Sequence, residues 1–167
     1  MLVKSLLRPL HAAIFGLTAL AVAPAASAAA QMMPPRVNKH LYSATADPKA
    51  DIAASLKQAR AEHKRVILDF GGDWCGDCQV LDIYFHQSPN AEILSKHFLV
   101  VHIDIGRMDK NVDIADKYNI PLQKGVPALA VLDSRGKLLY SQKTGEFEDM
   151  RNMRSQSVTE FLNRWKA

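Results

Sequence analysis

Two cysteines, Cys75 and Cys78, are the residues whose spacing most clearly predicts chemistry in this chain. They are its only cysteines, and a bridge between residues three positions apart closes a loop too small to constrain the unfolded chain much. Reactivity therefore explains the pair better than stabilisation does. A thiolate at the first position can attack a disulfide, and a second thiol nearby can resolve the mixed disulfide that results. The pair predicts thiol–disulfide exchange.

The elements around the pair predict which sulfur reacts first. The apolar run 66–70 is typical of a buried strand, and the cysteines then open a helix over about 75–85. Backbone N–H groups and the positive end of the helix dipole stabilise a thiolate at a helix N-terminus. We therefore expect Cys75 to be the exposed nucleophile. Cys78, one turn further on and shielded, is expected to be the resolving thiol.

A metal site is the alternative interpretation, because half of a zinc site has the same cysteine spacing. The sequence has no second Cys-x-x-Cys that would complete a four-cysteine site. His86 is better interpreted as a surface helix residue than as a ligand. His63, His97 and His102 are likewise interpreted as surface residues or hydrogen-bonded strand residues. We expect neither a metal nor another cofactor.

The segment from Asp69 to Cys78 resembles the active-site segment of the thioredoxin family, within a resemblance that covers about residues 47–166. Trp74-Cys75-Gly76-x-Cys78 is similar to the family motif. Asp69, six positions before Cys75, matches the buried acid of the family. The resemblance implies that Asp69 accepts a proton during exchange.

The segment Gly125-Val126-Pro127 resembles the family segment that carries a cis-proline beside the cysteine pair. The resemblance implies that Val126 and Pro127 help to hold the substrate backbone. Trp74 is interpreted either as a substrate contact or as packing over the site, and the sequence does not decide between the two.

The sequence also departs from the family pattern. Asp77 stands where many relatives carry proline, and Gly71 and Gly72 replace bulkier residues. Residues 121–124 lengthen the segment before Gly125. The opening strand of the family is not obvious, and residues 41–44 are the only candidate. These departures bear on which partner protein is recognised more than on the thiol–disulfide chemistry.

Acidic side chains near the pair predict the direction of exchange. Asp73 and Asp77 flank Cys75, and Asp69 is expected beneath it. One negative charge at ~8 Å disfavours a thiolate by roughly 2 kcal/mol at an effective dielectric of ~20. Strong oxidants instead stabilise their thiolate. We therefore expect a potential nearer the ~−270 mV of thioredoxin than the ~−120 mV of a strong oxidant.

Alternating patterns predict an α/β fold, which we expect to be a single thioredoxin-like domain with a central mixed sheet and helices on both faces. Asp47-Pro48 opens the first helix as N-cap and first helical residue. Further helices are predicted over 90–96 and 111–118, and further strands over 98–105, 128–132 and 138–141. The last two strands have hairpin spacing, which gives the sheet an antiparallel edge.

The last helix has the clearest pattern. Ser157 and Glu160 have the spacing of a capping box. Val158, Phe161, Leu162 and Trp165 follow at i, i+3, i+4 and i+7, which predicts one buried face.

The N-terminus predicts export. Lys4 and Arg8 precede a short apolar run, and Ala26-Ser27-Ala28 fits a cleavage site. We expect a signal peptide over 1–28, with a cut as late as residue 30, a linker over 31–46 and the domain over 47–167. The run is too short for a membrane helix, which needs about 20 residues. We therefore expect a periplasmic or secreted protein without a membrane span after cleavage.

The expected partners follow from charge and from the resemblance. Cleavage lowers the net charge from +4 to about +2, and no basic stripe with interleaved aromatics indicates nucleic acid. We expect protein disulfides as substrates, a membrane thiol reductase as electron donor, and a monomer. Two alternatives stay open: a dedicated reductant for cytochrome c maturation, and a non-enzymatic module that binds copper or a partner through the same cysteines.

Overall fold

The computed structural model describes residues 40–167, so the predicted signal peptide and most of the predicted linker lie outside the described residues. The elements follow the order expected from the sequence. In chain order they are α1 (Pro48–Glu62), β1 (Arg65–Gly71), α2 (Gly76–Phe85), α3 (Asn90–His97), β2 (Phe98–Asp104), α4 (Val112–Lys117), η1 (Leu122–Lys124), β3 (Ala128–Leu132), β4 (Leu138–Ser141), η2 (Met150–Asn152) and α5 (Ser155–Trp165).

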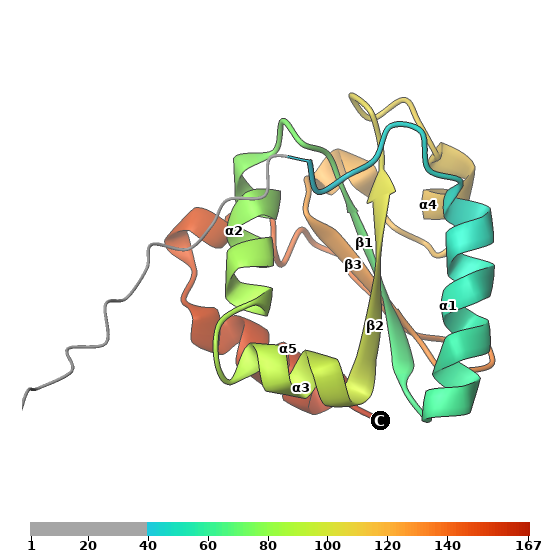
Figure 1. Cartoon of the computed structure of the whole chain (residues 1–167). Helices are drawn as coiled ribbons and strands as arrows, with labels where there is room; N and C mark the ends of the chain where they lie inside the picture. Colours follow the sequence, from blue (N-terminus) through green and yellow to red (C-terminus); the bar gives the residue numbers. More distant parts are fainter. Residues whose placement is uncertain (1–39) are drawn as a thin grey trace, which may run out of the picture. The chain divides into compact units, whose positions relative to one another are not determined.

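The four strands form one mixed sheet in the order β2-β1-β3-β4. Strand β1 pairs with β2 in parallel and with β3 antiparallel, and β3 and β4 form the predicted antiparallel hairpin. The α2–α3 segment makes the long connection that parallel pairing of β1 and β2 requires (Figure 1). Strand β1, which leads to the cysteines, therefore lies inside the sheet.

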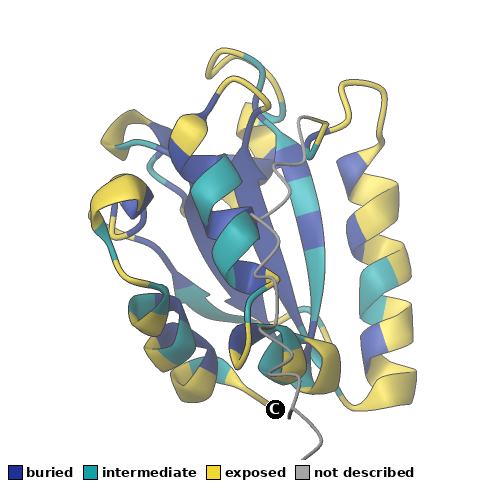
Figure 2. Cartoon of the chain, turned by 60° about the vertical axis from the view of Figure 1, so that its left-hand side comes forward, coloured by how far each residue is buried: buried dark blue, intermediate teal, exposed yellow. Residues whose placement is uncertain are grey.

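Helices cover both faces of the sheet (Figure 1). Helices α1 and α4 pack through Ile52, Ala59 and Ile114 against one face. Helices α2, α3 and α5 cover the other face. The second core contains Ile67, Leu81, Phe85, Leu129, Val131, Val158, Phe161 and Leu162. Strands β1 and β3 are buried between helices whose outer faces are exposed, whereas the edge strands β2 and β4 are half-buried (Figure 2). The mixed sheet with helices on both faces is confirmed.

The predicted start of α1 is confirmed. The Asp47 carboxylate accepts hydrogen bonds from the backbone N–H groups of Lys49 and Ala50 at 3.0 and 3.2 Å, and Pro48 is the first helical residue. These bonds satisfy N–H groups that the first turn leaves without partners.

The candidate opening strand does not form, and the predicted start of the last helix is wrong. Residues 41–44 form no strand; the backbone N–H of Tyr42 donates to the Asp73 carboxylate at 2.9 Å instead of to a sheet neighbour. The predicted capping box does not begin the last helix, because the N-cap of α5 is Arg154, three residues before Ser157, and the helix begins at Ser155 without a side-chain cap. The buried Asn90 amide donates to Ser155 Oγ at 3.1 Å, so a contact with α3 holds this first turn. The predicted inward face of α5 is nevertheless buried.

Candidate active site

The two cysteines form a disulfide at the N-terminus of α2. Cys75 is the N-cap in extended conformation, and the backbone N–H of Cys78 donates to Cys75 Sγ at 3.1 Å. Cys78 has no exposed surface and Cys75 retains 5%. Cys75 is the more exposed of the two cysteines, as predicted. It is less exposed than its place at a helix N-terminus led us to expect.

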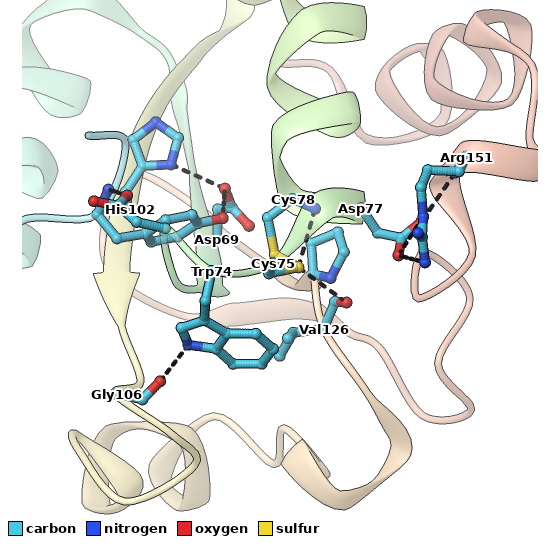
Figure 3. Close-up of a disulfide and its surroundings, with 12 residues drawn as sticks. Asp69, Trp74, Cys75, Asp77, Cys78, His102, Gly106, Val126 and Arg151 are labelled. Carbon is cyan, nitrogen blue, oxygen red and sulfur yellow. Dashed lines mark hydrogen bonds and ion pairs between the residues drawn. A yellow bond between two sulfur atoms is a disulfide. The ribbon is translucent and has the colours of Figure 1, made fainter. Parts of the chain in front are cut away.

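The Val126–Pro127 segment faces the disulfide from the start of β3 (Figure 3). Cys75 Sγ lies 3.5 Å from the carbonyl oxygen of Val126. The peptide bond between Val126 and Pro127 is cis. The structure thus places the nucleophile predicted from the motif beside the segment predicted to hold substrate.

Trp74 lies beside the disulfide, and 42% of the residue is exposed. Its Nε1 donates a hydrogen bond to the carbonyl oxygen of Gly106 at 2.6 Å (Figure 3). The Arg107 guanidinium lies 4.9 Å from the ring centroid, within the range of a cation–π contact. A Cβ at position 72 would lie 2.6 Å from Nε1, so Gly72 makes room for the indole. Trp74 is therefore both packed and available to a partner.

Asp69 lies in β1 with 1% of its surface exposed. Two side chains contact its Oδ2: the Tyr42 hydroxyl donates at 2.8 Å, and His102 Nδ1 lies at 2.9 Å (Figure 3). Its Oδ1 is buried and has no hydrogen-bond partner among residues 40–167. The sequence predicted a buried acid here, and the structure adds two partners.

The surroundings shift the pKa values of these two partners. Burial raises the pKa of Tyr42 well above its usual range, and the negative charge of Asp69 raises it further. Burial lowers the pKa of His102, but the hydrogen bond to Asp69 and the charge of Asp69 outweigh it, so this pKa is raised overall. Tyr42 is therefore a neutral donor to Asp69, and His102 is biased toward its cationic form.

The structure corrects the charge argument at Asp77. The Asp77 side chain is nearly buried, and Arg151 Nη2 lies 2.9 Å from its Oδ2. Arg151 Nε contacts both carboxylate oxygens at 3.1 Å, and the Arg151 backbone N–H donates at 3.0 Å (Figure 3). A guanidinium held this way offsets the acid. Asp77 therefore does not act on the Cys75 thiolate as an uncompensated charge.

A model of the thioredoxin-like family matches residues 47–134. The chain belongs to this family. A crystal structure titled as a disulphide isomerase from Xylella fastidiosa Temecula1 is 35% identical, with a TM-score of 0.70 over 74% of this chain and 95% of that one.

Curated relatives are similar over a smaller share of their own length. The thiol:disulfide interchange protein DsbD of Pseudomonas fluorescens is 28% identical over 137 residues, which are 77% of this chain and 20% of that protein. A protein disulfide-isomerase of Zea mays is 30% identical over 92 residues, 53% of this chain and 17% of that protein. The chain thus spans about a fifth of the length of these relatives.

Three residues of this thioredoxin-like site, Tyr42, His102 and Arg151, were not found from the sequence. His102 was interpreted as a strand residue, and Tyr42 was placed in the linker before the domain. The parallel register pairs Asp69 with His102 across β1 and β2. The sequence of one strand alone does not show this pairing. A histidine inside the apolar run 98–105 was the available signal for that residue. Tyr42 gave no comparable signal.

The other chemistry-bearing side chains of residues 40–167 form no metal cluster. Within this range, no group of three or more His, Cys, Asp or Glu residues could hold a metal ion. His86 is exposed at the end of α2, where its Nδ1 lies 3.2 Å from Asp82 Oδ1. No helix in the described part of the chain is long and apolar enough to cross a membrane.

Proposed function

We propose that this protein is a periplasmic thiol–disulfide oxidoreductase that reduces protein disulfides through Cys75 and Cys78. The observation that carries the proposal is the disulfide itself, formed at the N-terminus of α2 with Cys75 Sγ 3.5 Å from the Val126 carbonyl oxygen. Two sulfurs can carry both electrons of a disulfide reduction, so the reaction requires no further cofactor.

The reaction begins from the reduced pair. The Cys78 N–H and the dipole of α2 stabilise the Cys75 thiolate, which attacks one sulfur of a substrate disulfide and releases the other as a thiolate. Cys78 then gives its proton to Asp69 and attacks Cys75 Sγ. The Cys75–substrate bond breaks as the Cys75–Cys78 bond forms. The substrate has gained two electrons, and the protein is left oxidised.

Substrate binding would use the surface around Cys75. The carbonyl oxygen of Val126 can accept a backbone hydrogen bond from an extended segment, with Pro127 beside it, and Trp74 offers an exposed aromatic face. A groove of about 570 Å³ next to this segment is lined in part by Met108 and Val112, which are exposed apolar side chains. These features suit a polypeptide substrate.

The reducing direction is supported by Asp69, whose ion-pair partner among residues 40–167 is a histidine and not an arginine. Asp69 is buried beneath the site. Negative charge near the cysteines disfavours the thiolate and so favours the disulfide form. A protein whose disulfide form is favoured in this way acts as a reductant.

The N-terminal pattern of the sequence supports export to a compartment in which disulfides persist. A reductant there needs a supply of electrons. We assign that role to a membrane thiol reductase, and we expect the mature protein to act as a monomer.

Reduction of insulin by the mature protein, with dithiothreitol as electron source, tests the activity. We expect insulin precipitation well ahead of dithiothreitol alone, none of this acceleration in Cys75→Ser, and a trapped mixed disulfide in Cys78→Ser. No acceleration by the wild-type protein, together with metal retained after purification, would favour the metal-binding alternative.

A further inference from the structure

A buried acid that accepts a proton in every cycle must also pass it on to solvent. Asp69 has 1% of its surface exposed, so it has almost no contact with water of its own. Both of its hydrogen-bonding neighbours, Tyr42 and His102, contact Oδ2. Oδ1 is left without a hydrogen-bond partner among the described residues, so the carboxylate retains an acceptor.

His102 extends from this carboxylate toward the surface. Its side chain is 26% exposed, while that of Asp69 is 1% exposed. The parallel register of β1 and β2 places the two residues opposite one another, and the second ring nitrogen of His102 points away from Asp69 (Figure 3). One side chain therefore contacts both the buried acid and the solvent side.

The Tyr42 hydroxyl lies close to both Asp69 and the resolving cysteine. A Cβ built at Gly71 would lie 2.5 Å from Tyr42 Oη and 2.8 Å from Cys78 Sγ, so both atoms border the space that this glycine leaves open. The Tyr42 hydroxyl donates to Asp69 at 2.8 Å, and its ring packs edge-on against His102 with centroids 5.4 Å apart. Tyr42 thus fixes the carboxylate between the sulfur and the histidine.

We propose that Tyr42 and His102 turn Asp69 into a proton route between Cys78 and solvent, in which Tyr42 positions the carboxylate and His102 passes the proton to water. The proposal rests on the proposed function, because a proton crosses this route only when Cys78 takes part in exchange. Neither side chain contacts the reacting sulfur of a substrate, so both are positioning residues that act through Asp69.

Protons and electrons balance in the resolution step. The Asp69 carboxylate takes the proton of the Cys78 thiol, and the Cys78 thiolate attacks Cys75 Sγ. The substrate leaves as a thiolate, which takes a proton from water. With His102 in its neutral form, the carboxyl group gives its proton to the ring at Nδ1, and the ring releases one to water at Nε2, so the route opens as the pH rises through the pKa of His102. The carboxylate is restored, and the dithiol has lost the two electrons that the substrate gained.

The titratable groups around His102 set the pH range of this route. Asp69 faces it from β1, Tyr42 from the segment before α1, and Asp82 from α2. Asp82 in turn contacts His86 at 3.2 Å. Burial lowers the pKa of His102, but Asp69 and then Asp82 raise it above its usual value. The resolution rate should therefore carry an inflection from His102 above its usual pKa of about 6.5.

Single-turnover kinetics of the reduced mature protein with a peptide disulfide test the route. A Cys78→Ser background measures the Cys75 attack alone. We expect His102→Gln to slow resolution by about 100-fold, the lower end of the range for general acid–base groups, and to remove the inflection. The Cys75 attack should stay unchanged, and imidazole should restore part of the rate of His102→Ala.

Tyr42→Phe should also slow resolution. His97→Gln, outside the site, is the matched control.

Wild-type resolution rates and an unchanged pH profile in folded His102→Gln would overturn the route and leave the proposed function intact. A folded His102→Ala without any imidazole rescue would overturn it too. If the wild-type protein itself forms no mixed disulfide, the route and the proposed function fail together.

Discussion

Arg151 is the residue that most changes the electrostatics expected at the cysteines. Asp77 lies between Cys75 and Cys78 in sequence, and its carboxylate is held by the Arg151 side chain and backbone. A Cβ at Gly76 would come within 3.9 Å of Arg151 Cδ, so the arginine chain lies close to the redox motif. The charge next to the nucleophile is therefore that of an ion pair.

Substitution of Arg151 should make the protein more reducing. In Arg151→Gln the Asp77 carboxylate loses its counter-charge, so the pKa of the Cys75 thiol should rise, by at most about one pH unit because solvent screens part of a ~2 kcal/mol interaction. Thiolate absorbance as a function of pH measures the pKa of Cys75, and equilibration with dithiothreitol measures the reduction potential. Asp77→Asn is the matched control and should shift them in the opposite direction. Equal shifts in the same direction would contradict this account of the pair.

Gly71 should not tolerate a side chain. In Gly71→Ala the new Cβ would crowd Tyr42 Oη and Cys78 Sγ, and such overpacking costs roughly 1–3 kcal/mol of the free energy of unfolding. Chemical denaturation of the oxidised protein measures the cost. Gly76→Ala is the control, because its Cβ would meet nothing nearer than 3.9 Å. If the two variants lose the same stability, close packing at Gly71 is not the reason.

At the scale of elements, Asn90 joins α3 to α5. It has no exposed surface, its amide donates to the Tyr84 carbonyl at 2.9 Å and to Ser155 Oγ at 3.1 Å, and the Thr159 hydroxyl donates to its Oδ1 at 2.6 Å. These bonds fix where α5 begins, far along the chain from the cysteines.

Asn90→Ala should therefore lower the free energy of unfolding by roughly 2–4 kcal/mol, since three half-buried polar partners lose their bonds to a fully buried amide. The reduction potential should not change, because none of these partners contacts the disulfide. Denaturation and redox equilibration of the same sample separate the two effects. Gln156→Ala, which removes an exposed bond to Glu160, should stay within about 0.5 kcal/mol of wild type. A changed potential in Asn90→Ala would contradict this separation of roles.

The sequence predicted elements well where a local pattern alone determines them. Strands 128–132 and 138–141 were predicted at their observed bounds, and Asp47-Pro48 marked the start of α1. The start of α5 was not predictable, because a contact with Asn90 outweighs the local capping signal. The same holds within the site: the cysteine pair is a local motif, whereas Tyr42, His102 and Arg151 reach it through strand register and long-range contacts.

At the scale of the whole molecule, His102 links stability to pH. Its pKa is raised in the folded protein, so its contribution to stability is fully present below its unfolded value of about 6.5 and is lost as the pH rises through the folded value. The stability advantage of wild type over His102→Gln should therefore shrink from about pH 6.5 upward. Denaturation curves of both proteins across this range measure it. An advantage that grows with pH would contradict the assignment.

The reduction potential of the Cys75–Cys78 pair tests the central claim most directly. The mature protein would be equilibrated in glutathione and dithiothreitol buffers, and its redox state followed by thiol alkylation. We predict one reversible two-electron transition below about −220 mV, nearer thioredoxin at ~−270 mV than a strong oxidant. A transition near ~−120 mV would reverse the direction of electron flow, and the absence of a reversible transition would contradict thiol–disulfide exchange altogether.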